Sequence, residues 1–334
     1  MLLGETFRER AMKLKGTILF STALGAAAIL MTAHFAQSQP PAGAPGASGG
    51  RGGGRALGGA RAFDYSDNEG WMKIFDGSTM NGWAGNTKYW SVKDDSLYIH
   101  PSCEAPTGTT YIYWTNGEAG DFELKYELKG TEQVNGGMQF RSYLTASDDV
   151  SFKFPPRAAR GGFGGGRGAS GGRGAAFAGA GGRGGSGRGG GGRGPGCANP
   201  GQPPSREEMA KWDLNGPQAD FDANNNFTGM FYEQGGRGII SGPGHALLAE
   251  PGKPVQDLGT IADKATLDSW FHKGDWNQFL IVARGHTTSI YMNEHLVTLF
   301  IDNDPNYFRA AGRLGPEVES TGEYWVRNIY LKRF

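Results

Sequence analysis

The sequence has few of the residues that build covalent or metal-bound frameworks. Its 334 residues include two cysteines, Cys103 and Cys197, and six histidines that show neither an HxH nor an HExxH spacing. Two cysteines permit one disulfide at most, and whether these two pair is left open by the sequence. The histidine spacing argues against a zinc site, so we expect no metal centre of that kind.

Long apolar runs are also scarce, with one exception near the N-terminus. A cationic stretch over residues 8–15 precedes an apolar run over residues 16–33, and Ala36-Gln37-Ser38 has the small-x-small pattern of a cleavage site. This order predicts a signal peptide over residues 1–38, and therefore a periplasmic or secreted protein with no membrane span after cleavage. A retained membrane anchor is the alternative.

Glycine, in contrast, is abundant at 58 residues and gathers in two tracts, a linker over residues 39–63 and an insertion over residues 157–204. Both tracts contain arginine, no acidic residue and little that could form a core, so we expect them to be disordered. Repeats such as Arg160-Gly161-Gly162-Phe163 are typical of nucleic-acid-binding tails. Because the chain is predicted to be exported, we expect no nucleic-acid partner, and a solvated loop beside an acidic body is the preferred interpretation.

Helical patterns are limited to two short segments. Ser205 followed by Glu208 predicts a helix to about Trp212, and residues 263–271 predict another. Elsewhere, short runs alternate apolar and polar residues between turn signals, which predicts many strands and an all-β sandwich or barrel. Residues 64–334 then form one domain that the glycine-rich insertion interrupts, because strands on both sides are needed to close two sheets. The clearest runs are 90–92, 122–128, 137–141, 278–282, 289–292 and 324–331.

Two of the expected strands place polar side chains two residues apart. In residues 218–222 the alternation puts Gln218, Asp220 and Asp222 on one face, with Ala219 and Phe221 on the other. In residues 137–141 it puts Gln139 and Arg141 on one face. If these strands are neighbours, carboxylate, amide and guanidinium groups converge in a site; a solvent-exposed face with incidental ion pairs is the alternative.

Several segments, read in order, resemble the 3-keto-disaccharide hydrolase domain, a bacterial family formerly known as a domain of unknown function. The resemblance covers residues 70–334 apart from the Arg/Gly insertion, and it is specific as a set. It implies a concanavalin-like jelly roll of two antiparallel sheets with a concave face for sugar, and cleavage of disaccharides oxidised at C3. The matching segments are GWMKIFDG (70–77), NGW (81–83), WSVK (90–93), GDFEL (120–124), NGGMQFR (135–141), GPQADFD (216–222), GMFY (229–232), GGRG (235–238), GDWN (274–277), ARG (283–285) and VRNI (326–329).

One segment departs from the family pattern. Family members usually carry a Gln-x-His pair in the penultimate strand, where this chain has RLGPEVE over residues 313–319. The departure predicts that a polar contributor to the site is missing. A non-catalytic carbohydrate-binding module of the same fold is therefore the second hypothesis, and a structural or adhesive envelope protein is the third.

The activity that the resemblance implies gives the polar residues roles. A 3-keto group acidifies the hydrogen at C2, so a base there, a donor at the enolate oxygen and an acid at the leaving oxygen cleave the bond by elimination and hydration. Asp220 or Asp222 is the candidate base, and Arg141 the enolate stabiliser. The candidate acids are Tyr232 and Glu233, and the candidate substrate-binding residues are Gln139, Gln218 and Arg237. An ordinary two-carboxylate glycosidase is the competing mechanism.

The same region has one pattern of metal ligands. Asp220, Asp222, Asn224 and Asn226 alternate like the oxygen ligands of a calcium loop, although Asn225 and Phe231 replace the glycine and the bidentate glutamate of that motif. Asp and Asn also form ordinary turns. We therefore expect no obligatory cofactor, with calcium as the minor alternative, and the sequence leaves the oligomeric state open.

Overall fold

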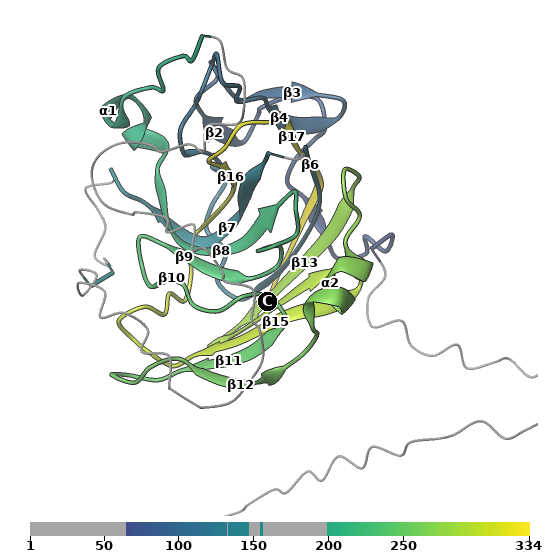
Figure 1. Cartoon of the computed structure of the whole chain (residues 1–334), viewed down its shortest axis with the longest axis vertical. Coiled ribbons are helices and arrows are strands. Elements are labelled where there is room, and N and C mark those ends of the chain that lie inside the picture. Colours follow the sequence, from purple (N-terminus) through teal and green to yellow (C-terminus); the bar gives the residue numbers. More distant parts are fainter. Residues whose placement is uncertain (1–64, 132, 147–153, 156–198) are drawn as a thin grey trace, which may run out of the picture. The chain divides into compact units, whose positions relative to one another are not determined.

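The computed structural model describes residues 65–131, 133–146, 154–155 and 199–334 (Figure 1). The chain divides into two units, Met1–Leu57 and Gly58–Phe334, and the first lies wholly outside the described residues. The predicted signal peptide, the linker and residues 157–198 of the predicted insertion also lie outside them, so these boundaries stay predictions. Within the described ranges, no helix has both the length and the apolar character needed to cross a membrane.

The described residues form two sheets. The larger has ten strands, in the order β12-β11-β15-β14-β13-β6-β17-β4-β3, with β1 paired to β17. Its strands are β1 (Met72–Lys73), β3 (Ser91–Lys93), β4 (Ser96–Ile99), β6 (Phe122–Gly130), β11 (His245–Ala249), β12 (Gln256–Thr260), β13 (Asn277–Arg284), β14 (Thr287–Met292), β15 (His295–Asp302) and β17 (Tyr324–Arg333).

The smaller sheet has seven strands, in the order β10-β9-β8-β7-β16-β5-β2. Strands β7 and β8 lie at its centre, which is why the polar residues that they carry become neighbours. Its strands are β2 (Trp83–Gly85), β5 (Thr110–Trp114), β7 (Asn135–Leu144), β8 (Leu214–Asp222), β9 (Phe231–Gln234), β10 (Gly238–Ile239) and β16 (Arg313–Val318).

Aromatic side chains from both sheets meet in one core. Phe140 of β7 contacts Phe122 of β6 edge to face at 6.2 Å between ring centroids, and Phe231 of β9 contacts Phe300 of β15 at 4.5 Å. Phe221 of β8 packs edge to face on Phe279 of β13 at 6.5 Å. These rings are buried, so the two sheets are the layers of a β-sandwich and the predicted all-β jelly roll is confirmed.

Turns and helices lie where the sequence predicts them. Asp94 and Asp95 both have a positive φ between β3 and β4, as two-residue hairpin turns require. Helix α1 (Arg206–Met209) begins after Ser205, whose hydroxyl accepts from Glu208 N–H at 3.2 Å, and the 3-10 helix η1 (Ala210–Trp212) continues it. Helix α2 (Lys264–Trp270) is capped by Asp263.

One pairing, that of β11, departs from the antiparallel pattern of the two sheets. Strand β11 pairs with β12 antiparallel but with β15 in parallel, with Ala246 opposite Leu299. The chain runs from β11 through β12, α2, β13 and β14 before it reaches β15. A connection of that length allows the parallel arrangement, which a short hairpin does not.

Candidate functional site

A row of buried polar side chains crosses the middle of the seven-stranded sheet. The register places Gln139 of β7 opposite Gln218 of β8, and Gly137 opposite both Asp220 of β8 and Glu317 of β16. Alternation puts these side chains on the face away from the core, because Met138, Ala219 and Phe221 lie in the core. The four polar residues are 0–7% exposed, so this polar face is shielded from water.

Hydrogen bonds link the polar face into one chain of groups. Ser142 Oγ donates to Gln139 Oε1 at 2.8 Å, and Gln139 Nε2 donates to Gln218 Oε1 at 3.3 Å. Gln218 Nε2 then donates to Glu317 Oε2 at 2.8 Å. Each amide is oriented by the next, so the chain fixes one oxygen of Glu317 and leaves the other directed elsewhere.

Gly137 makes room for this arrangement. It lies between Asp220 and Glu317 in the register, and a Cβ at this position would lie 2.5 Å from Gln218 Nε2 and 2.5 Å from Ala219 O. The Gln218 side chain therefore occupies the space above Gly137 on its way to Glu317. Because two strand spacings separate them, the Cα atoms of Asp220 and Glu317 are about 10 Å apart.

Asp220 and Glu317 are buried carboxylates with unused hydrogen-bonding capacity. Within the part of the chain that the structure describes, Asp220 Oδ1 and Glu317 Oε1 are buried and have no hydrogen-bond partner. Burial raises the pKa of Asp220 well above its usual value, and the charges of Glu319 and Asp222 raise it further. Burial likewise raises the pKa of Glu317, with added repulsion from Glu319 and Asp220. A carboxyl group with a raised pKa keeps its proton to a higher pH than an exposed one, which suits it to general acid and base chemistry.

Tyrosines flank the carboxylates on the same face. Tyr111 of β5 lies opposite Glu317 and is 2% exposed, and its burial raises the pKa of the phenol well above the usual value. Tyr232 of β9 lies opposite Gln218 and is half-buried. A phenol with a high pKa stays protonated and can donate a hydrogen bond to an oxygen that gains charge.

Arg141 lies apart from this face, which the alternation alone did not predict. Its φ is +45° and the register of β7 shifts between Gln139 and Tyr143, so a bulge turns its side chain away. The guanidinium donates to Gly120 O at 3.0 Å, to Gly285 O at 2.9 Å and to Asp121 Oδ1 at 3.0 Å. Arg141 thus ties β7 to loops of the other sheet, and its expected role as enolate stabiliser is not supported by its position.

Glu233 and Arg237 also lie apart from the carboxylate pair. Phe231 packs into the core two residues before Glu233 on β9, so Glu233 points to the core side of the sheet. Arg237 Nε donates to Glu233 Oε2 at 2.7 Å, and the same guanidinium pairs with Asp302 of β15. These three residues form an internal ion cluster between the sheets. Glu233 therefore lies away from the polar face where the expected acid would act, and Arg237 lies away from the polar face where it was expected to bind substrate.

Asp222 lies on the polar face at the end of β8, but its carboxylate closes its own turn. Oδ1 accepts from Asn224 N–H at 3.0 Å and from Asn226 Nδ2 at 3.2 Å, and Oδ2 accepts from Phe227 N–H at 2.6 Å. These contacts are those of an Asx turn. In the described ranges, no three or more His, Cys, Asp or Glu side chains gather in a way that could hold a metal ion, and calcium at these residues stays a prediction.

Strand β16 corrects the expectation that residues 313–319 lack a polar contributor. Glu317 of this strand is 4% exposed beside Gln218, and Glu319 follows it, with Oε1 accepting from Asn135 Nδ2 at 2.7 Å. The alternation Glu317-Val318-Glu319 was visible in the sequence. It could have identified both carboxylates, because a buried valine between two acids predicts that they share the opposite face.

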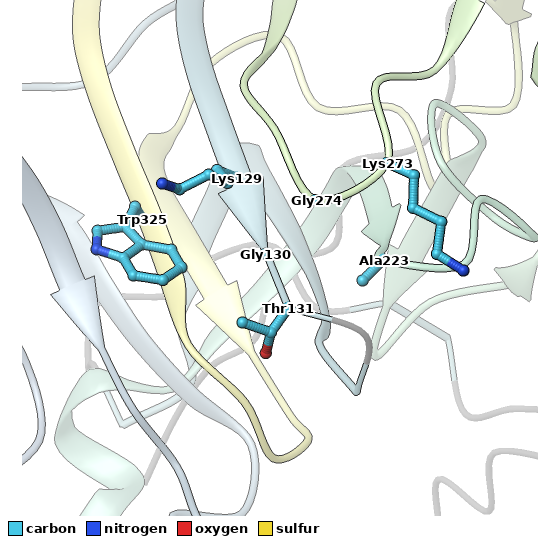
Figure 2. Close-up of a pocket in the computed structure, with 7 residues that line it drawn as sticks. All are labelled: Lys129, Gly130, Thr131, Ala223, Lys273, Gly274 and Trp325. Atoms are coloured by element: carbon cyan, nitrogen blue, oxygen red, sulfur yellow. The ribbon is translucent and has the colours of Figure 1, made fainter. Parts of the chain in front are cut away.

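A hollow of about 460 Å³ lies at the ends of β6, β8 and β17. Figure 2 shows Lys129 and Trp325 on one side of it and Ala223 and Lys273 on the other. Ala223 directly follows Asp222, but neither Asp220 nor Glu317 lines the hollow.

Cys103 lies at a different edge of the sandwich. It is disulfide-bonded, and its carbonyl accepts from Gly201 N–H at 2.9 Å. The sequence has one other cysteine, Cys197, which lies outside the described residues. Gly201, near the end of the predicted insertion, therefore lies beside Cys103.

Fold and site together define a jelly-roll β-sandwich with an acidic, amide-lined sheet face. The chain belongs to the family of the 3-keto-alpha-glucoside-1,2-lyase-like domain, whose model matches residues 70–161 and 201–332. The resemblance seen in the sequence is thereby confirmed.

Solved structures are similar to this chain at low sequence identity. They include a candidate glycosyl hydrolase from Parabacteroides distasonis (12% identity, TM-score 0.41, 80% of this chain and 94% of that one). Carbohydrate-binding module CBM66 from Bacillus subtilis has 13% identity and a TM-score of 0.38, covering 76% and 98%. A protein of unknown function with a galectin-like fold, also from Bacillus subtilis, has 11% identity and a TM-score of 0.41, covering 79% and 94%. A search of curated proteins found no match.

Proposed function

We propose that this protein cleaves 3-keto-α-glucosides by elimination across C1 and C2 of the oxidised sugar. The observation that carries the proposal is the pair of buried carboxylates, Asp220 and Glu317, each with an oxygen lacking a partner among the described residues, in a chain that belongs to a 3-keto-alpha-glucoside-1,2-lyase-like family. Elimination needs one group that takes a proton and one that gives a proton, and two carboxyl groups with raised pKa values supply both.

The elimination balances without an oxidant or a cofactor. A base removes the proton from C2, which the neighbouring keto group acidifies, and the electron pair forms the C1=C2 double bond. The C1–O bond breaks, and the leaving oxygen takes a proton from an acid to give the free alcohol. The product is an enone with the double bond conjugated to the C3 carbonyl. Addition of water across C1=C2 then gives the reducing 3-keto sugar, so the net reaction is hydrolysis.

Asp220 is assigned the base and Glu317 the acid. Glu317 has one oxygen held by Gln218 Nε2, so its proton resides on the other oxygen, which is the geometry an acid needs. Asp220, with no cation among the causes of its pKa shift, is a stronger base than an exposed aspartate. Tyr232, which lies opposite Gln218 on the neighbouring strand β9, is assigned as the donor to the enolate oxygen. Gln139 and Gln218 are assigned to orient the sugar hydroxyls.

The assignment is tested with methyl 3-keto-α-glucoside, followed by enone absorbance and by methanol release. The wild-type protein is expected to release methanol, and Asp220→Asn and Glu317→Gln are expected to lower the rate. Glu123→Gln, a change on the other sheet where Glu123 pairs with Arg284 at 3.2 Å, is the matched control. Methanol release by Asp220→Asn at the wild-type rate would remove Asp220 as the base.

The second candidate is a non-catalytic carbohydrate-binding module. It is favoured by the position of the 460 Å³ hollow, which neither carboxylate lines. Sugar binding without any methanol release or enone would establish it in place of the lyase. Export to the periplasm or the cell exterior, as the N-terminal sequence predicts, would bring either protein to its glycosides, and detection of the mature protein outside the cytoplasm tests that part.

A further inference from the structure

The outer face of the ten-stranded sheet carries a second hollow, of about 440 Å³. Its floor comes from three adjacent strands, because Glu127 of β6 lies opposite both Gln278 of β13 and Arg327 of β17. Alternation directs these side chains away from the core, since Leu128, Phe279 and Val326 beside them are core residues. The hollow therefore lies on the opposite side of the sandwich from Asp220 and Glu317.

Aromatic rings form the walls of this outer hollow. Trp270, at the end of α2, stacks on His295 with ring centroids 4.2 Å apart and planes 4° apart. Trp276 lies beneath the Arg327 guanidinium at 3.8 Å from its ring centroid. Both tryptophans are half-buried, so each keeps part of its surface open to a ligand.

Backbone contacts hold the walls in place. Asn293 Nδ2 donates to Trp270 O at 2.7 Å, and His272 Nδ1 lies 3.1 Å from Trp276 O. Asn277, which is fully buried, accepts from His272 N–H at 2.8 Å through Oδ1. Because these contacts already order the loops, ligand binding to the hollow costs little conformational entropy.

The polar groups of the outer hollow match a neutral sugar. Glu127 Oε2 accepts from Arg327 Nε at 2.7 Å, and Gln278 Nε2 lies 3.5 Å from Glu127 Oε1. The lining thus offers carboxylate and amide oxygens to sugar hydroxyls and tryptophan edges to the apolar ring face. Two acids, Glu127 and Glu294, and one arginine, Arg327, line the hollow. Because Arg327 is already paired with Glu127, the lining has no excess of positive charge for a polyanion.

The outer hollow also continues toward the Lys129–Trp325 hollow of Figure 2. Lys129 lines that first hollow, and its Nζ lies 5.0 Å from the ring centroid of Trp276, which lines the second. The loop that carries Lys273 and Gly274 in the first also carries His272 and Trp276 in the second. A ligand longer than one ring has contacts in both.

We propose that the outer hollow is a second, non-catalytic glycan-binding site that holds a pyranose ring of a neutral glucan, with a further ring over Lys129 and Trp325. It keeps the protein on a polymer while the opposite face processes small glycosides. This inference rests on the proposed function only in taking sugar as the ligand class.

Affinity electrophoresis of the purified protein in gels with soluble starch or with soluble β-glucan tests the site. We expect retardation by at least one of these polymers and about tenfold weaker retardation for Trp276→Ala, as for the loss of an aromatic anchor. Glu127→Gln, which preserves shape, is the second variant and decides the outcome if Trp276→Ala unfolds. Trp71→Ala is the matched control, because Trp71 lies over Lys125 on the same sheet face at 4.7 Å but outside the hollow.

Equal retardation of wild type and both variants would overturn the site, as would no retardation of the wild-type protein by either polymer. The outcome for the glycan-binding site is independent of the outcome for the proposed lyase activity. Retardation that depends on Trp276, without turnover of a 3-keto-glucoside, supports the glycan site and overturns the lyase. Turnover of a 3-keto-glucoside without retardation by either polymer supports the lyase and overturns the glycan site.

Discussion

The two sheet faces that point away from the core differ in how their acidic side chains are compensated. On the outer face of the ten-stranded sheet, acids meet bases at the surface: Arg327 pairs with Glu127 at 2.7 Å and Arg284 with Glu123 at 3.2 Å. On the polar face of the seven-stranded sheet, Asp220 and Glu317 are 7% and 4% exposed, and amide and backbone groups take the place of a cation.

The difference lies in how the charges are compensated, by ion pairs on the ten-stranded sheet and without a cation on the polar face, where we propose proton transfer. Exposed ion pairs leave both charges hydrated and contribute little to stability. A buried carboxylate without a cation is costly to ionise, so it retains its proton to a higher pH. Two such groups on one sheet face do not stabilise the fold, and their position in one row supports the proposed role in proton transfer.

The largest expected effect comes from neutralising the buried carboxylates. Asp220→Asn and Glu317→Gln each remove a proton-transfer group while preserving shape, so kcat/KM for a 3-keto-α-glucoside should fall by about 10²- to 10⁴-fold. Glu123→Gln on the other sheet should change kcat/KM by less than about twofold, because an exposed pair of this kind is weak. Initial-rate kinetics on the three variants check the contrast, and equal losses in all three would contradict it.

The internal ion cluster between the sheets should respond through stability. Arg237→Met leaves Glu233, which is fully buried, without its guanidinium, and should cost about 3–5 kcal/mol of unfolding free energy. Glu123→Gln should cost at most about 1 kcal/mol. Urea unfolding followed by tryptophan fluorescence measures both. A cost for Arg237→Met no larger than that for Glu123→Gln would show that the cluster is hydrated.

Gly137→Ala tests whether the Gln218 amide is positioned by the absence of a side chain. The new methyl group would lie 2.5 Å from both Gln218 Nε2 and Ala219 O, so the amide that holds Glu317 must move. We expect kcat/KM to fall by about 10²-fold, as for an ångström-scale misplacement of a catalytic group. A crystal structure of the variant with Gln218 still bonded to Glu317 and unchanged kinetics would contradict this role.

The smallest expected effect is the pH dependence of stability. Folding raises the pKa of Asp220 and of Glu317, whereas in the unfolded chain such groups lose their protons near pH 4. Above about pH 4 the folded protein binds more protons than the unfolded chain, so the unfolding free energy contributed by these groups falls as pH rises through the raised pKa values. Asp220→Asn and Glu317→Gln should show a shallower fall in urea unfolding across that range, and parallel curves would contradict the shifts.

The alternation of residues predicted the sheet positions well where strands are regular. It placed Gln218 and Asp220 on one face of β8 and Ala219 and Phe221 on the other face. The structure confirms this and pairs Gln139 with Gln218. It misplaced Arg141, because a bulge with positive φ breaks the period of β7. A bulge of this kind depends on the partner strand, so the sequence of β7 alone does not reveal it.

Other site residues required contacts that are distant in sequence. Glu317 joins the site through a bond to Gln218, 99 residues away, and the family motif directed attention to the missing Gln-x-His pair rather than to Glu317 and Glu319. Glu233, a candidate acid in the sequence, shares the core side of β9 with Phe231. The pairing of Arg237 with both Glu233 and Asp302 of β15 is a contact between the sheets that the sequence does not reveal.

Exchange of the C2 hydrogen of methyl 3-keto-α-glucoside in D₂O, followed by NMR together with methanol release, tests the assignment of base and acid most directly. The wild-type protein should remove the C2 hydrogen and release methanol. Asp220→Asn should do neither, whereas Glu317→Gln should still exchange C2 while it releases methanol slowly, because the base remains and the acid is lost. C2 exchange at the wild-type rate in Asp220→Asn would contradict the account.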